Sequence, residues 1–107
     1  MKDTRPVAYG YLHAAPDADD NTSWKLEAEL RRYADDQGFE LAGLFYEDVA
    51  GCFATWEALA HELRQANAHH VIVPSFSHLT QHKLLLEHLL DRLERSSRAE
   101  VHELHPR

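Results

Sequence analysis

Short apolar runs alternate with longer stretches of helical periodicity along the whole chain, and no other feature restricts the fold as strongly. The runs of strand length are residues 7–12, 39–46, 71–74 and, more weakly, 99–104. Apolar residues at helical spacing occupy the intervals, in residues 21–37, in the stretch that begins at Thr55, and in residues 78–95. Strands separated by helices form parallel βαβ units with right-handed crossovers. The alternation predicts a single three-layer α/β domain over residues 1–107, with helices on both faces of a flavodoxin-like, mostly parallel four-stranded sheet.

Several expected boundaries carry residues that begin or end secondary structure. Asn21, Thr22 and Ser23 offer N-caps for the first helix, and Gly38 fits the stop signal that follows it. Thr55 is the predicted N-cap of the second helix. These signals support the division of the chain into the elements given above.

The charge balance restricts the kind of partner. The chain has 11 Lys and Arg residues against 18 Asp and Glu residues, for a net charge of −7. Because affinity for nucleic acid comes largely from clustered basic residues that release counterions, direct DNA binding is disfavoured. No apolar run approaches the roughly 20 residues that span a bilayer, and no signal-peptide stretch opens the chain. We therefore expect a cytoplasmic protein without membrane contact.

The order 2-1-3-4, which suits such a sheet, gives a position for any ligand. Open parallel sheets bind ligands beyond the carboxyl ends of the strands, where the strand order reverses. Here that point lies between the first and third strands, so the segments 13–16 and 74–78 would border it, with the residues after the second strand beside them. The predicted cleft comprises His13, Ala15, Glu47, Asp48, Ser75, Ser77 and His78.

The two segments that border this cleft carry a family resemblance. Residues 11–15 read Tyr-Leu-His-Ala-Ala, and residues 76–81 read Phe-Ser-His-Leu-Thr-Gln. They resemble the two active-site motifs of the resolvase/invertase family of serine recombinases, Tyr-x-Arg-x-Ser and Leu-Asp-Arg-Leu-x-Arg. Residues 47–51 are similar to that family's acidic-x-x-Ser-Gly loop. The resemblance covers almost the whole chain and only the family's catalytic domain; no helix-turn-helix DNA-binding module is apparent.

The departures from the family pattern fall on its chemistry. The family's serine attacks a DNA phosphodiester, and its arginines clamp the phosphate and stabilise the developing charge. Ala15 stands at the serine position, and Trp56 lies near the place of a further arginine. The other degenerate positions are His13, Ala50, Ser77, His78 and Gln81. The resemblance therefore implies a domain without catalytic residues and without a cofactor.

Two alternatives to simple loss of function involve the histidines, of which the chain has nine. His78 and His82 are four residues apart in the predicted third helix and could share a metal ion, with His13 as a third ligand. Glu47 or Asp48 would then supply an acid or base. Protonated histidines in the same cleft could instead bind a small anion, or the cleft could be no more than a solvated polar surface.

The third helix has more leucine than one core-facing stripe needs. Leu85 and Leu89 are the residues that we expect at a homodimer contact, although a broad stripe packed within the domain would also explain them. The favoured hypothesis is a non-catalytic resolvase-like module that dimerises or binds a protein partner. It would regulate recombination or transcription, or reach DNA through that partner.

Overall fold

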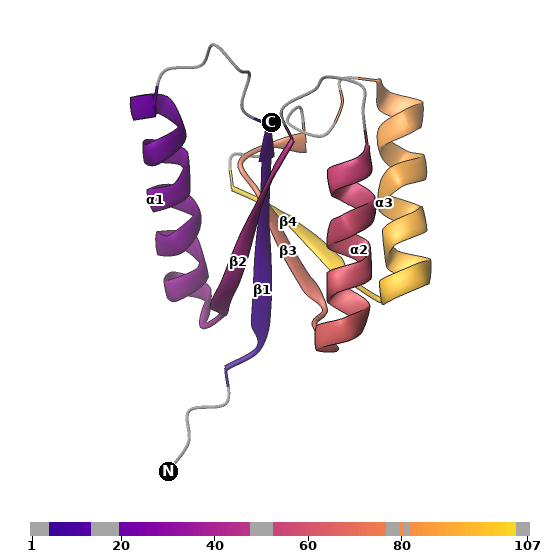
Figure 1. The fold of residues 1–107 in the computed structure, drawn as a ribbon, viewed down its shortest axis with the longest axis horizontal. Helices are drawn as coiled ribbons and strands as arrows, with labels where there is room; N and C mark the ends of the chain where they lie inside the picture. Colours follow the sequence, from indigo (N-terminus) through magenta and orange to yellow (C-terminus); the bar gives the residue numbers. More distant parts are fainter. Residues whose placement is uncertain (1–4, 14–19, 48–52, 77–79, 81, 105–107) are drawn as a thin grey trace.

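The fold consists of a parallel sheet between one helix on one face and two helices on the other (Figure 1). The computed structural model describes residues 5–13, 20–47, 53–76, 80 and 82–104. Its elements, in chain order, are β1 (Val7–His13), α1 (Asp20–Gln37), β2 (Glu40–Glu47), α2 (Ala54–Ala66), β3 (His70–Val73), α3 (Lys83–Ser97) and β4 (Glu100–Glu103).

All pairings in the sheet are parallel, and the strand order is β2-β1-β3-β4. This confirms the predicted α/β class and the predicted order. The register places His13 opposite Glu47 at the carboxyl ends of β1 and β2. It also places Val73 opposite Glu103 at the carboxyl ends of β3 and β4. One end of the sheet therefore collects the last residues of all four strands.

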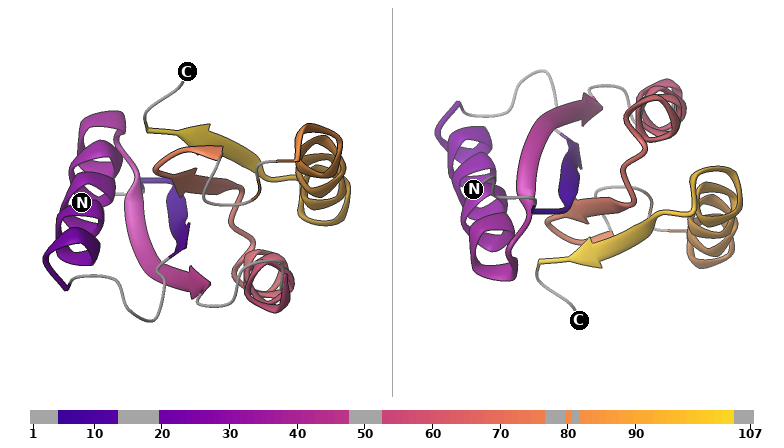
Figure 2. Two further views of the ribbon diagram at one scale, coloured as in Figure 1. Left: turned by 90° about the horizontal axis from the view of Figure 1, so that it is seen from above. Right: turned by 90° about the horizontal axis from the view of Figure 1, so that it is seen from below.

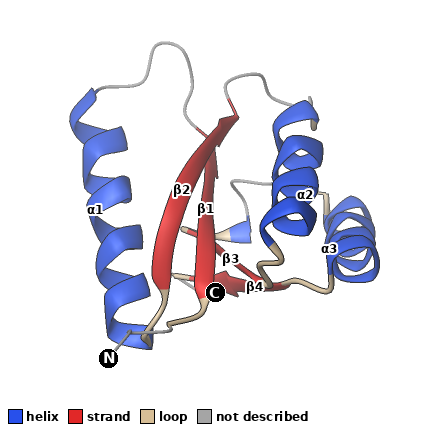
Figure 3. Cartoon of the chain, turned by 60° about the horizontal axis from the view of Figure 1, so that its bottom comes forward, coloured by secondary structure: helices blue, strands red, loops and turns tan. Residues whose placement is uncertain are grey.

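The helices cover the two faces unequally, with α1 alone on one side and α2 and α3 together on the other (Figures 2 and 3). Because strand side chains alternate between faces, the strands supply two separate apolar clusters. The cluster on the α1 side contains Ala8, Leu12, Leu30, Ala34 and Ile72. The larger cluster, on the side of α2 and α3, includes Tyr9, Tyr11, Trp56, Leu59, Leu63, Val71, Val73, Leu89 and Leu93.

Gly10 permits the close approach of α1 to the central strand. A Cβ atom at this position would lie 2.5 Å from Cδ2 of Leu44 and 3.3 Å from Cδ1 of Leu30. A side chain here would therefore force the neighbouring leucines to move. The absence of a side chain at residue 10 lets Leu30 pack directly over β1.

The predicted starts of two helices were wrong. Helix α2 has Phe53 at its N-cap, and Thr55 lies within the first turn. The Thr55 hydroxyl donates to the carbonyl of Tyr46 over 3.3 Å, so it ties the helix to the end of β2 instead of capping it. Helix α3 begins at Lys83 and not at residue 78, with His82 as its N-cap.

The leucines of α3 differ in their exposure. Leu89 is only 5% exposed and packs in the larger core cluster, together with Leu93. Leu85, Leu86 and Leu90 are partly buried against the same cluster. Leu89 is thus held inside the domain and does not present its side chain to a partner, in contrast to the expectation for an interface.

No helix in the described part of the chain is both long enough and apolar enough to cross a membrane.

Candidate functional site

The carboxyl edge of the sheet holds the described part of the predicted cleft. His13 is the last residue of β1 and Glu47 the last of β2, and they are register partners. Ser75 follows the buried Pro74 at the end of β3. The structure thus brings His13, Glu47 and Ser75 to the same edge. The remaining predicted residues, Ala15, Asp48, Ala50, Ser77, His78 and Gln81, lie outside the described residues.

Glu47 is a buried carboxylate at this edge, only 5% exposed. Among the described residues, its Oε1 has no hydrogen-bond partner. An unsatisfied buried acceptor costs about 1–3 kcal/mol, so a buried carboxylate at this position lowers the stability of the fold. Glu47 is also the acidic residue of the loop that resembles the recombinase pattern. The described part of the edge therefore carries a buried carboxylate.

The segment that leaves β3 is held by the outer strand β4. The backbone N–H of Phe76 donates to Oε2 of Glu103 over 2.9 Å. Further along, the N–H of Thr80 donates to the carbonyl of Phe76 over 3.1 Å. Glu103 thus positions the start of the second motif segment. The sequence reasoning missed it, although the order 2-1-3-4 already placed the ends of β3 and β4 side by side.

Tyr11 and Trp56 form an edge-to-face pair beneath the carboxyl edge. Their ring centroids are 5.0 Å apart and the rings are inclined by 83°. Trp56 is 1% exposed and belongs to the core cluster between the sheet and α2. Near the place where the resemblance expects an arginine, this chain therefore has a packed apolar ring.

The metal pair proposed from sequence required His78 and His82 to lie in one helix. Residue 80 and His82 both lie outside helices, and α3 starts only at Lys83. His82 thus precedes the helix, and His78 lies outside the described residues. The exposed His82 acts through its backbone, whose N–H donates to Oγ1 of Thr80 over 3.2 Å and whose carbonyl accepts from Leu86 over 2.8 Å.

A different group of titratable side chains gathers at the amino end of the sheet. His70 Nδ1 lies 3.2 Å from His102 Nε2, and the same His102 nitrogen lies 3.5 Å from Oε1 of Glu100. Burial and then the neighbouring His102 are the main causes that lower the pKa of His70 below 6.5. The sequence reasoning did not identify this group. The available signal was a Glu-x-His pattern on an edge strand, with His70 beginning the adjacent strand.

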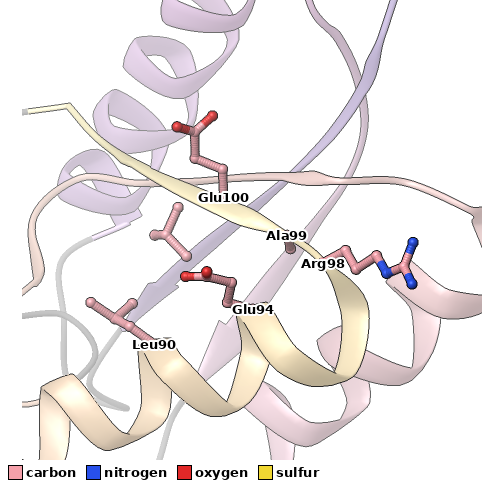
Figure 4. Close-up of a pocket in the computed structure, with 6 residues that line it drawn as sticks. Leu90, Glu94, Arg98, Ala99 and Glu100 are labelled. Atoms are coloured by element: carbon pink, nitrogen blue, oxygen red, sulfur yellow. The ribbon is translucent and has the colours of Figure 1, made fainter.

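A groove lies between α3 and β4, away from the carboxyl edge (Figure 4). Its volume is about 630 Å³, and it is lined by Leu90, Glu94, Arg98, Ala99, Glu100 and Val101. Arg98 caps the end of α3 and Glu100 begins β4, so the groove opens beside the amino end of that strand. It therefore does not coincide with the predicted cleft.

Comparison with solved structures finds this fold in serine recombinase catalytic domains. The C-terminal catalytic domain of ISC1926 TnpA, an IS607-like serine recombinase, matches with a TM-score of 0.77 and 12% identity, over 92% of this chain and 67% of that one. The N-terminal catalytic domain of TP901-1 integrase matches with a TM-score of 0.73 and 13% identity, over 92% and 76% of the two chains. No protein-family model and no curated protein sequence matches the chain. At these identities the likeness establishes the fold.

Proposed function

We propose that this chain is a resolvase-like domain that does not cleave DNA and acts by association, as a regulatory module in recombination or transcription. One observation carries the proposal: the fold is that of serine recombinase catalytic domains, while alanine occupies the position that matches the nucleophile. An alanine side chain has no hydroxyl to attack a phosphodiester. The covalent step of the family mechanism therefore has no nucleophile at Ala15.

The replaced arginine positions support the same conclusion. A guanidinium is permanently charged and binds a phosphate through two parallel hydrogen bonds. The imidazoles of His13 and His78 offer neither property at neutral pH, and the amide of Gln81 is uncharged. Loss of even one donor that stabilises a developing charge costs about 100- to 1,000-fold in rate. Replacement of three such residues removes most of the electrostatic stabilisation along with the nucleophile.

Trp56 adds a packing argument. Its ring is buried against Tyr11 in the main core. A guanidinium placed among these apolar side chains would lose its hydration, and burying an unpaired charge costs several kcal/mol. The apolar core thus occupies space that a charged catalytic group would need, and this part of the domain is organised for stability.

The proposed contact is with a second copy of the chain, through α3. Leu84, on the first turn of this helix, is 81% exposed, and Leu85 beside it is only partly buried. Leu84 is therefore the exposed leucine of α3, and Leu85 borders it while also packing against the core cluster. The net charge of −7 disfavours direct attachment to DNA, so a link to DNA would pass through a protein partner.

Sedimentation velocity over a range of protein concentrations tests the proposed contact. We expect a dimer for the native chain and a shift to monomer for Leu84→Glu and for Leu85→Glu. Ala28→Glu is the matched control, because it adds the same charge at an exposed position of α1 on the other side of the sheet. Leu89→Glu is unsuitable because Leu89 lies in the core. A native chain that stays monomeric, or a dimer lost only in Ala28→Glu, would refute association through α3.

A further inference from the structure

The His70, Glu100 and His102 side chains project from neighbouring strands onto the same side of the sheet. His70 is the register partner of Glu100, and His102 that of Ile72. Ile72 belongs to the α1-side core cluster. Residues two apart on a strand share a face, so Glu100 and His102 flank one side of β4 while His70 approaches from β3. In Figure 4, Glu100 points to the side of β4 away from α3.

We propose that these three residues form a binding site for one divalent transition-metal ion of the zinc type. A His₂Glu set is a donor combination that zinc accepts. One ligand atom from each residue lies within 4.8 Å of the other two. The site is separate from the carboxyl edge and from Leu84. The proposal therefore goes beyond the proposed function, and its test does not depend on that function.

Two of the distances among the ligand atoms agree with the spacing that one shared ion requires. Ligand atoms bound tetrahedrally at about 2.0–2.2 Å from zinc are separated from each other by roughly 3.3–3.5 Å. The separation of His70 Nδ1 and His102 Nε2 is 3.2 Å, and that of His102 Nε2 and Glu100 Oε1 is 3.5 Å. Small side-chain rotations would therefore let one ion contact His102 together with either neighbour, and the His70 and Glu100 ligand atoms lie within 4.8 Å of each other.

The two facing imidazole nitrogens are both able to ligate one cation. A neutral imidazole has one N–H donor and one lone pair, so a His–His contact uses one of each. With a metal ion, both nitrogens present their lone pairs to the charge. The Glu100 carboxylate then provides negative charge to balance the ion.

Aromatic rings fix the histidines on their buried side. The ring of Phe39 lies 4.5 Å from that of His70 and 5.3 Å from that of His102, centroid to centroid. The ring of Tyr33 lies 6.4 Å from that of His102. On the opposite side the Glu100 side chain is 72% exposed. The site is therefore supported by the core and open to solvent, which leaves a fourth position for water.

Titration of the tag-free, chelator-treated full chain with Co²⁺ and Zn²⁺ tests the site. The expected result is one ion per chain, with the visible absorption of four-coordinate Co²⁺ and its displacement by Zn²⁺. Loss of a partner that only supports a metal ligand weakens affinity 10- to 100-fold. We therefore expect at least a 100-fold loss for His102→Ala and for Glu100→Gln. Glu100→Gln changes an exposed side chain and should leave the fold intact.

His69→Ala is the matched control, because His69 is an exposed histidine next to the site whose Nδ1 lies 3.4 Å from the Ser97 carbonyl. It should bind metal like the native chain. Circular dichroism without metal verifies that each variant is folded. Failure of the native chain to bind one ion at millimolar Co²⁺, or equal binding by Glu100→Gln and the native chain, would overturn the proposal. Binding lost in His69→Ala but kept in His102→Ala would do the same.

Discussion

The backbone N–H of Phe76 donates a 2.9 Å hydrogen bond to Oε2 of Glu103, so the edge strand β4 holds the segment that leaves the third strand. This bond joins two regions 27 residues apart in the sequence. It also lies at the carboxyl edge, where sheets of this type place their ligands. A side chain that the motifs do not contain thus fixes the start of the second motif segment.

Replacement of Glu103 by alanine should release that segment. A hydrogen bond to a charged group contributes about 1.5–3 kcal/mol when partly buried, so we expect the free energy of unfolding to fall by about 1–2 kcal/mol. Hydrogen exchange at the Phe76 amide should accelerate. Urea unfolding and amide exchange followed by NMR measure both effects, with the exposed Glu87→Ala of α3 as control. Unchanged exchange at Phe76 would contradict the anchoring role.

An arginine at residue 56 should destabilise the fold. Trp56→Arg would leave a cavity and bury a guanidinium beside Tyr11, and we expect a loss of about 3–5 kcal/mol in the free energy of unfolding. Trp56→Phe keeps an aromatic ring next to Tyr11 and should cost about 1–2 kcal/mol. Chemical denaturation of the two variants makes the comparison. Equal free energies of unfolding for Trp56→Arg and Trp56→Phe would show that the apolar core does not require an apolar side chain at this position.

Tyr9 should make stability depend on alkaline pH. Burial, followed by the 2.9 Å hydrogen bond that its hydroxyl donates to Glu62, raises the pKa of Tyr9 above 10.0. A raised pKa means that the unfolded chain loses this proton first. The stabilisation is therefore complete below pH 10 and declines as the pH rises from there through the folded-state pKa.

The Tyr9→Phe variant tests this dependence. At neutral pH it should lower the free energy of unfolding by about 1 kcal/mol, and its stability should decline less than that of the native chain as the pH rises above about 10. Urea midpoints at a series of pH values supply the measurement. Tyr33→Phe is a control, because Tyr33 is a partly buried tyrosine on the α1 side, away from Glu62. Parallel pH profiles for native chain and Tyr9→Phe would disprove the linkage.

The sequence predicted the sheet well because its signal is repeated along the chain. Each strand is an apolar run set apart by a helical interval, and only parallel pairing with crossovers accommodates that pattern. The start of α3 was misplaced because the helical spacing in the sequence continues before Lys83, whereas the backbone of His82 is extended. The hydroxyl of Thr80 accepts from the His82 N–H, and His82 then becomes the N-cap.

The candidate sites were harder to predict because they depend on which face a residue occupies. Leu85 and Leu89 lie one helical turn apart, yet only the structure shows that Leu89 faces the core. His70 and His102 are 32 residues apart, and their contact requires the register of β3 and β4 as well as their adjacency. The His78 and His82 hypothesis relied on residue spacing within a single helix. Such spacing does not predict contacts between residues on different strands.

The central claim is that this domain keeps the recombinase fold without strand cleavage. Incubation of the native chain with supercoiled DNA, followed by denaturing electrophoresis, measures it most directly, because the family mechanism leaves the protein covalently attached to DNA. A catalytically competent serine recombinase with its own site is the positive control. We predict no covalent adduct and no nicked DNA for the native chain, nor for Ala15→Ser, which restores the hydroxyl without the arginines. A denaturant-resistant adduct formed by the native chain would contradict the account.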